Sequence, residues 1–191
     1  LDKLIIKTPD DFNRMGINVH LNSKLKKIYP NDNKVLINDF IVEYDYLILA
    51  LGAYATIPEI ENVNINNVFT LRCLDSAQKI KEKMQNSKSV LIIGGGYIAL
   101  ELTEAFVKNG LKVTIIEKNS RIMHTLDEDI SAVIQNAITS NFKDKIETYY
   151  SKSIVKLNSN NENNFKSAVD SEGKEYHADF CILCTGAKPN V

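Results

Sequence analysis

One short segment, residues 90–106, limits the possible folds of this chain more than any other part of the sequence. It reads VLIIGGGYIALELTEAF, which is an apolar run, three glycines from Gly94 to Gly96, and an apolar stripe with helical spacing. In a GxGxxG/A pattern the first glycine permits a tight turn and the second lets the backbone approach a pyrophosphate. The small third residue, here Ala99, lets the helix pack closely on the strand. The segment therefore predicts a Rossmann-type unit with a pyrophosphate at the helix N-terminus.

A carboxylate at the expected distance completes this fingerprint. Glu117 ends a second apolar run and lies 23 residues after Gly94 (117 minus 94), close to the roughly 20 residues expected for the acid that binds the adenine ribose. A 2′-phosphate at this carboxylate would meet a repulsion of about 4 kcal/mol at 4 Å and an effective dielectric near 20. The sequence therefore favours NADH. NADPH stays open, because Lys118 and Arg121 follow and either soften this repulsion or serve only as solvated surface charges.

The segments around this fingerprint alternate between strands and helices, which predicts a parallel α/β sheet. We expect strands at 89–93, 112–116 and 145–150, and helices at 75–85, 96–109 and 127–140. A polar loop at 158–164 joins two strands of a hairpin, 153–157 and 165–169. Before residue 45, short alternating segments at 17–21, 24–28 and 34–37 predict a small antiparallel unit. The continuous apolar run at 46–50 predicts a buried strand.

A sequence repeat brackets the dinucleotide unit. DYLILALGA at 45–53 returns as DFCILCTGA at 179–187, which is 134 residues later (179 minus 45). Two similar strand ends on either side of the unit indicate a chain that leaves one domain, builds a second and returns to the first.

These features resemble the FAD-dependent pyridine nucleotide-disulfide oxidoreductases, and the resemblance covers essentially the whole chain. It is strongest for the branch of NADH oxidases, NADH peroxidases and coenzyme A-disulfide reductases. The matching segments are 8–12, 44–53, 68–72, 94–101 and 185–190. The resemblance implies an α/β fold in which a Rossmann-type NAD(P)H domain is inserted in a partial FAD domain. The expected division is 1–61 for the partial FAD-binding domain, 62–179 for the NAD(P)H domain, and 180–191 for a return strand into the FAD domain.

The resemblance also implies residue roles. Tyr97 would be a gate over the flavin's nicotinamide face and Glu101 a carboxylate beside the reacting rings. These two are four residues apart and share a helix face; the alternatives are a packing aromatic and a surface acid. The dinucleotide would contact Gly94, Gly95, Gly96, Tyr97, Ile98, Glu117, Lys118 and Gly186. FAD would contact Leu25, Ala50, Leu51, Gly52, Ala53 and Arg72.

The chain departs from the family pattern in several places. No second GxGxxG precedes residue 90, and the redox cysteine, the later Gly-Asp flavin segment and the dimerisation domain are not found. We therefore expect a fragment of an enzyme that is a homodimer when intact, and a chain that does not complete the flavin reaction alone. Cys181 and Cys184 do not replace the redox centre, because residues three apart in a strand point to opposite faces.

The function expected for the intact enzyme is hydride transfer from NADH to FAD and on to a disulfide, a peroxide or oxygen. Two alternatives are a non-catalytic dinucleotide-binding module and a flavin-free dehydrogenase, for which no substrate acid or base is found. Lysine and arginine (23) nearly equal aspartate and glutamate (24), which argues against nucleic-acid binding. No apolar run suits a membrane span, the three histidines lack metal spacing, and the expected location is cytoplasmic.

Overall fold

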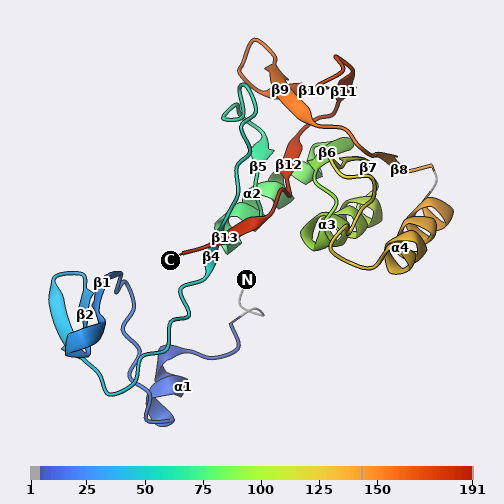
Figure 1. The fold of residues 1–191 in the computed structure, drawn as a ribbon. Helices are drawn as coiled ribbons and strands as arrows, with labels where there is room; N and C mark the ends of the chain where they lie inside the picture. The colour runs from blue at the N-terminus through green and yellow to red at the C-terminus, as the bar shows by residue number, and fades with distance from the viewer. Residues whose placement is uncertain (1–4, 143, 191) are drawn as a thin grey trace. The chain divides into compact units, whose positions relative to one another are not determined.

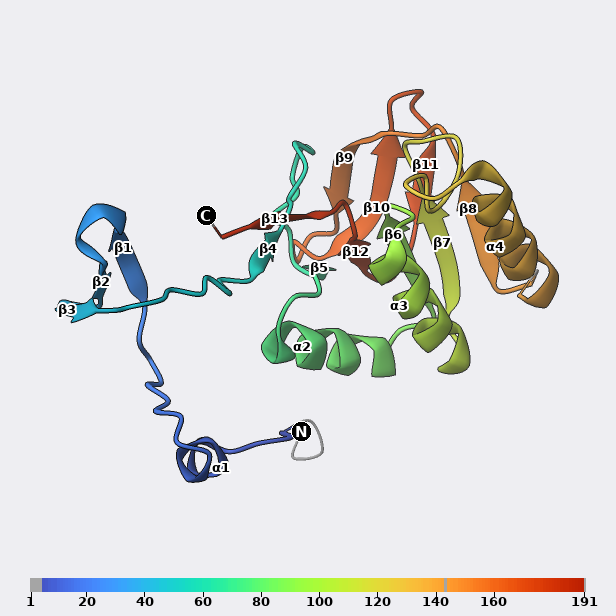
Figure 2. The same cartoon turned by 60° about the horizontal axis from the view of Figure 1, so that its bottom comes forward.

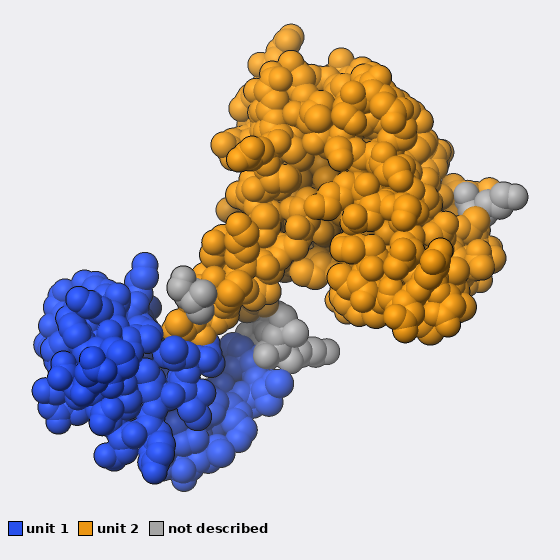
Figure 3. Space-filling model, in the orientation of Figure 1, with its two compact units in different colours: residues 1–50 blue, residues 51–191 orange. Residues whose placement is uncertain are grey.

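The structure is a computed structural model that describes residues 5–142 and 144–190. The chain divides into two compact units, the first ending at Ala50 and the second beginning at Leu51 (Figure 3).

The first unit contains one short helix and a three-stranded antiparallel sheet. Helix α1 (Pro9–Arg14) begins after Thr8, whose hydroxyl accepts from the Asp11 N–H in a capping box. Strands β1 (Leu25–Tyr29), β2 (Lys34–Ile37) and β3 (Phe40–Glu43) pair in sequence order. The expected strands at 24–28 and 34–37 are therefore confirmed, and β3 is an additional strand.

Two predicted strands of this region are wrong. Residues 17–20 form neither helix nor strand, and the chain turns at Leu21 and Asn22, where Asn22 has a positive φ. Residues 46–50 form no strand, and Tyr46 is 94% exposed. In both cases the apolar residues have no neighbouring strand among the described residues. Without such a partner, neither backbone hydrogen bonds nor burial hold the segment in a sheet.

The second unit is built on a five-stranded parallel sheet (Figure 1). Its strand order is β5-β12-β6-β7-β8, and each neighbouring pair is parallel. The strands are β5 (Val68–Phe69), β6 (Ser89–Ile93), β7 (Lys112–Ile116), β8 (Ile146–Tyr149) and β12 (Cys181–Leu183). The helices of this unit are α2 (Leu74–Gln85), α3 (Tyr97–Lys108) and α4 (Glu128–Asn141). The α/β prediction and the expected order of strands and helices are confirmed.

Alternate residues of β6 face two different layers, as the two-residue period of a strand requires. Val90 and Ile92 join a core with Phe106 of α3 and Ile80 of α2. Leu91 and Ile93 face the other core, which contains Leu157. That second core is covered by a three-stranded antiparallel sheet, seen beside the parallel sheet in Figure 2. Its strands are β9 (Ile154–Ser159), β10 (Phe165–Asp170) and β11 (Glu175–His177).

Both Gly-Ala ends of the sequence repeat meet in one two-stranded sheet. Strand β4 (Ala53–Ala55) pairs antiparallel with β13 (Ala187–Pro189), and Ala187 lies opposite Ala55. Strand β12 lies between β5 and β6 in the parallel sheet of the second unit. The assignment of the flanking segments to an FAD domain stays a prediction. In the described part of the chain, no helix combines the length and apolar composition needed to cross a bilayer.

Candidate dinucleotide site

The glycine turn packs tightly against the neighbouring strand ends. Gly94 has φ +105°, and a Cβ atom placed on it would lie 2.4 Å from the carbonyl oxygen of Cys184. Its N–H donates to the Ile116 carbonyl at 2.8 Å. Any side chain at this position would push β6 away from the chain that follows β12. The requirement for glycine at the first position of the fingerprint therefore comes from this close approach.

The N-terminus of α3 presents uncapped backbone donors. Gly96 is the N-cap residue and offers no side-chain hydrogen bond to the first turn. A Cβ atom added to Gly96 would meet nothing within 4 Å, and Tyr97 at the first helical position is 60% exposed. The first N–H groups of a helix have no partner within the helix. The turn therefore offers open space and free donors to an anion such as a pyrophosphate.

Glu117 is buried and accepts a hydrogen bond from the glycine turn. Its side chain is 4% exposed, and its Oε2 atom accepts from the Gly95 N–H at 2.6 Å. Its Oε1 atom accepts from the backbone N–H of Asn119 at 2.8 Å and from the Asn119 side-chain amide at 2.6 Å. The two halves of the fingerprint are thus directly bonded. The sequence analysis did not identify Asn119.

The loop after β7 packs into the turn as well. A Cβ atom on Gly95 would lie 2.8 Å from Cγ2 of Ile122, and the Met123 N–H donates to the Gly95 carbonyl at 2.8 Å. Ser131 of α4 donates its hydroxyl to the Ile122 carbonyl at 2.6 Å. These contacts fix the loop beside the glycine turn, so Gly95 has a packing role of its own.

A largely apolar cavity of about 360 Å³ opens at the carboxyl ends of the parallel strands, which is where ligands bind in open α/β sheets. It brings together five of the predicted site residues: Arg72, Gly96, Tyr97, Ile98 and Gly186. The other lining residues were missed: Ala55, Leu71, Met123, His124, Thr125, Leu183, Cys184 and Ala187. Leu71 and Cys184 closely follow β5 and β12, where the strand-end rule would have identified them, whereas Met123, His124 and Thr125 belong to the loop between β7 and α4.

Several predicted residues lie outside this cavity lining. Glu101 is one helical turn after Tyr97 and is exposed, as is Lys118. Arg72 lines the cavity and donates its Nε–H to the Ala53 carbonyl at 2.7 Å. Leu51 and Gly52 precede β4, whereas Leu25 and Ala50 belong to the first unit. The FAD contacts predicted for these residues stay predictions.

The cysteines give no sign of a redox pair. Cys73, Cys181 and Cys184 are all free thiols. Burial raises the pKa of Cys184 to about 12 and raises the pKa of Cys181 further still. At neutral pH both are therefore protonated thiols rather than nucleophilic thiolates. Among the described residues, no group of histidine, cysteine and carboxylate side chains has the arrangement of a metal site.

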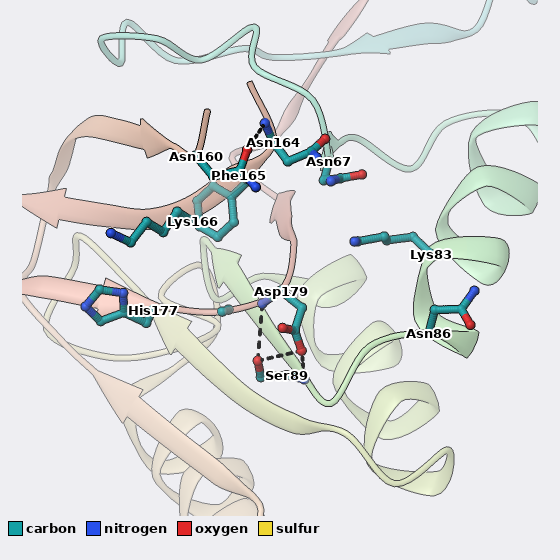
Figure 4. A pocket seen from close by; sticks show the side chains of 11 residues that line it. Asn67, Lys83, Asn86, Ser89, Asn160, Asn164, Phe165, Lys166, His177 and Asp179 are labelled. Carbon is teal, nitrogen blue, oxygen red and sulfur yellow. Dashed lines mark hydrogen bonds between the residues drawn. The ribbon is translucent and has the colours of Figure 1, made fainter. Parts of the chain in front are cut away.

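A second cavity, of about 460 Å³, lies at the opposite ends of the strands and is mainly polar. Figure 4 shows Lys83 of α2 reaching toward the space between Asn67 and Asp179. The Asp179 carboxylate is already occupied, because it accepts from the N–H groups of Lys88 and Ser89 at 2.7 and 2.9 Å. These bonds tie the start of β6 to the start of β12, so the acid has a structural role.

The glycine turn, the buried acid and the strand-end cavity form a candidate dinucleotide site on a parallel α/β unit. The chain belongs to the pyridine nucleotide-disulphide oxidoreductase family, whose model matches residues 9–191. The family resemblance found in the sequence is thereby confirmed.

Individual relatives agree with this assignment. An NAD(P)H sulfur oxidoreductase (CoA-dependent) from Pyrococcus furiosus is 35% identical over 196 residues, which cover 100% of this chain and 43% of the relative. The solved structure of an NAD-dependent persulfide reductase from A. fulgidus matches with a TM-score of 0.85 and 29% identity, covering 96% of this chain and 34% of that one. A water-forming NADH oxidase from Lactobacillus brevis, solved with NADH, has the same fold at 24% identity, with a TM-score of 0.85 and coverage of 99% of this chain and 42% of that one. The chain spans less than half the length of the relatives it matches.

Proposed function

We propose that this chain is the NAD(P)H-binding portion of a flavin-dependent oxidoreductase that passes hydride from NADH to FAD and on to a disulfide-type, peroxide or oxygen acceptor. The bond between the Glu117 carboxylate and the Gly95 N–H, at 2.6 Å, carries this proposal. It joins the acid expected at the adenine ribose to the turn expected at the pyrophosphate, beside a cavity that can hold the rest of the dinucleotide.

The proposed position of the dinucleotide follows from the site geometry. The pyrophosphate lies at the uncapped N-terminus of α3, where the N–H groups after Gly96 donate to its oxygens. The adenine ribose lies toward Glu117, and the nicotinamide end occupies the cavity between Tyr97 and Gly186. The bound cofactor supplies the hydride, and the protein supplies its placement.

Two side chains would act at the nicotinamide end. Tyr97 lines the cavity and is exposed enough to swing over a bound ring or away from it. Glu101 lies one turn further along α3. It would approach the reacting rings from the side on which the flavin binds. Arg72 lines the same cavity and would offer its terminal amino groups to a flavin phosphate.

The names of the relatives support the choice of acceptor class. The Pyrococcus furiosus relative is a CoA-dependent sulfur oxidoreductase, and a further relative, from Enterococcus faecalis, is an NADH oxidase. We propose a sulfur-based acceptor for the whole protein, because relatives above 30% identity that match the entire chain are named as a coenzyme A polysulfide/persulfide reductase and a sulfur oxidoreductase. The intact enzyme would carry FAD and act as a homodimer.

The test is a calorimetric titration of the chain with NADH, NADPH and FAD, together with its absorbance spectrum. We expect NADH to bind and the protein to be colourless, because the chain contains no second glycine turn for the FAD pyrophosphate. Glu117→Gln should weaken NADH binding about tenfold through loss of a charge-assisted hydrogen bond. Glu104→Gln, an exposed change on α3, is the matched control.

A non-catalytic dinucleotide-binding module is the alternative. Such a module would bind NADH equally well. NADH would, however, not reduce added FAD, and the yellow absorbance of FAD would remain, even when the remainder of the protein is supplied. Absence of NADH binding to the unaltered chain would contradict both functions.

A further inference from the structure

The charge of Glu117 is compensated in an unusual way. Its carboxylate is almost fully buried, yet among the described residues no lysine, arginine or histidine forms an ion pair with it. A buried charge of this kind needs hydrogen-bond donors in place of a counter-ion. The donors are the N–H groups of Gly95 and Asn119 and the side-chain amide of Asn119.

Only one of these three donors can move away. The Gly95 N–H is fixed within the glycine turn, which is packed against Ile122. The backbone of Asn119 is fixed on both sides, because its N–H donates to Glu117 and its carbonyl accepts from the Ser151 N–H at 2.9 Å. The Asn119 side chain is half-buried and rotates about its own side-chain bonds. It therefore occupies a place on Oε1 that a ribose hydroxyl could take.

The basic residues nearby are less suited to meet a 2′-phosphate. Arg121 directs Nη2 toward the carbonyls of His124 and Leu126, at 3.4 and 3.3 Å, and is turned into its own loop. Lys118 is exposed. If the Asn119 side-chain amide is released from Glu117, a side-chain rotation can still bring it to the ribose oxygen bound at Glu117. The amide is a neutral donor, so it can donate a hydrogen bond to a carboxylate or to a phosphate.

We propose that Asn119 determines how well this site accepts NADPH beside NADH. In the free protein its amide satisfies Oε1 of Glu117; when a dinucleotide binds, the adenine ribose takes that place. The released amide then donates to a 2′-phosphate and offsets its repulsion from Glu117. This inference rests on the proposed function, because it requires the dinucleotide to bind at Glu117.

Calorimetric titration of the full chain and of Asn119→Ala with NADH and NADPH tests the proposal. We expect the ratio of the NADPH Kd to the NADH Kd to rise about tenfold, as for loss of one hydrogen bond to a charged group. The NADH Kd should change by no more than about twofold, since the Gly95 and Asn119 N–H groups still hold Glu117. Asn119→Ser, which keeps a shorter donor, should give an intermediate ratio. Asn86→Ala, an exposed change after α2, is the matched control.

The outcomes separate the two proposals. An unchanged ratio in Asn119→Ala, or an equal loss of both affinities, would overturn the specificity role and leave the dinucleotide site in place. Binding of neither nucleotide to the unaltered chain would overturn the proposed function and this inference with it.

Discussion

The two copies of the internal repeat have similar sequences and different structures. In the second copy, 179–187, strand β12 pairs with β5 and β6, and the side chains of Phe180 and Ile182 are fully buried. In the first copy, 45–53, residues 46–50 form no strand, and Ile48, which corresponds to Ile182, is 89% exposed. An apolar run therefore supplies strand preference, whereas neighbouring strands supply the burial that stabilises it.

The largest expected effect comes from truncating the corresponding isoleucine in each copy of the repeat. Ile182→Ala deletes a fully buried side chain from a central strand and should lower the free energy of unfolding by about 2 to 5 kcal/mol. Ile48→Ala should change it by less than about 0.5 kcal/mol, because that side chain is exposed. Urea unfolding followed by circular dichroism measures both. Equal losses would show that residues 46–50 are buried in solution.

A smaller effect, on NADH binding, is expected to distinguish the glycines near the ends of the two copies. Gly186 (φ +109°) lines the cavity at the strand ends, whereas Gly52 (φ +71°) does not. Alanine is strained at both positions, but only the Cβ atom of Gly186→Ala would project beside the proposed nicotinamide end. We expect NADH binding to weaken about tenfold in Gly186→Ala and to stay unchanged in Gly52→Ala. Fluorescence titration with NADH distinguishes them, and similar affinities in the two variants would contradict the proposed placement.

The smallest effect concerns the acids that begin the two copies. Burial raises the pKa of the Asp179 carboxyl, but hydrogen bonds from Lys88 and Ser89 outweigh this and hold the pKa below its usual 3.8. The ionised Asp179 carboxylate therefore stabilises the fold above pH about 4. This stabilisation is lost as the pH falls through the lowered pKa of the folded protein. At neutral pH Asp179→Ala should cost about 1 kcal/mol, reduced by the exposure of the group, and Asp45→Ala almost nothing.

Urea unfolding of both variants at pH 7 and pH 3 measures this difference. The gap between Asp179→Ala and the unaltered chain should narrow at pH 3. A gap that stays constant across this range would mean that the Asp179 charge makes no contribution.

The parts predicted well from sequence are those governed by local pattern. Strands 89–93 and 112–116 are found with the same bounds, because a continuous apolar run bounded by glycine or charge has few other structures available. The hairpin around 158–164 is also found. Strands β3 and β11 were missed, since short strands at an edge carry a weak alternating pattern.

In the candidate site, too, residues marked by a local pattern were predicted and residues placed by tertiary contacts were missed. The sequence identified Glu117 and the glycines through their spacing, but not Asn119, which touches Glu117 through a hydrogen bond between near neighbours that no pattern marks. His124 and Thr125 also went unnoticed, because they line the cavity only after the loop is fixed by contacts of Gly95 and Ser131.

The sequence by itself determined a strand, a glycine turn, a helix and an acid in the order that a dinucleotide requires, because each depends on local backbone geometry and spacing. Only the tertiary structure decided which of two similar segments becomes a buried strand and which donors hold the acid. Those outcomes depend on contacts between distant residues, and a linear pattern does not contain them.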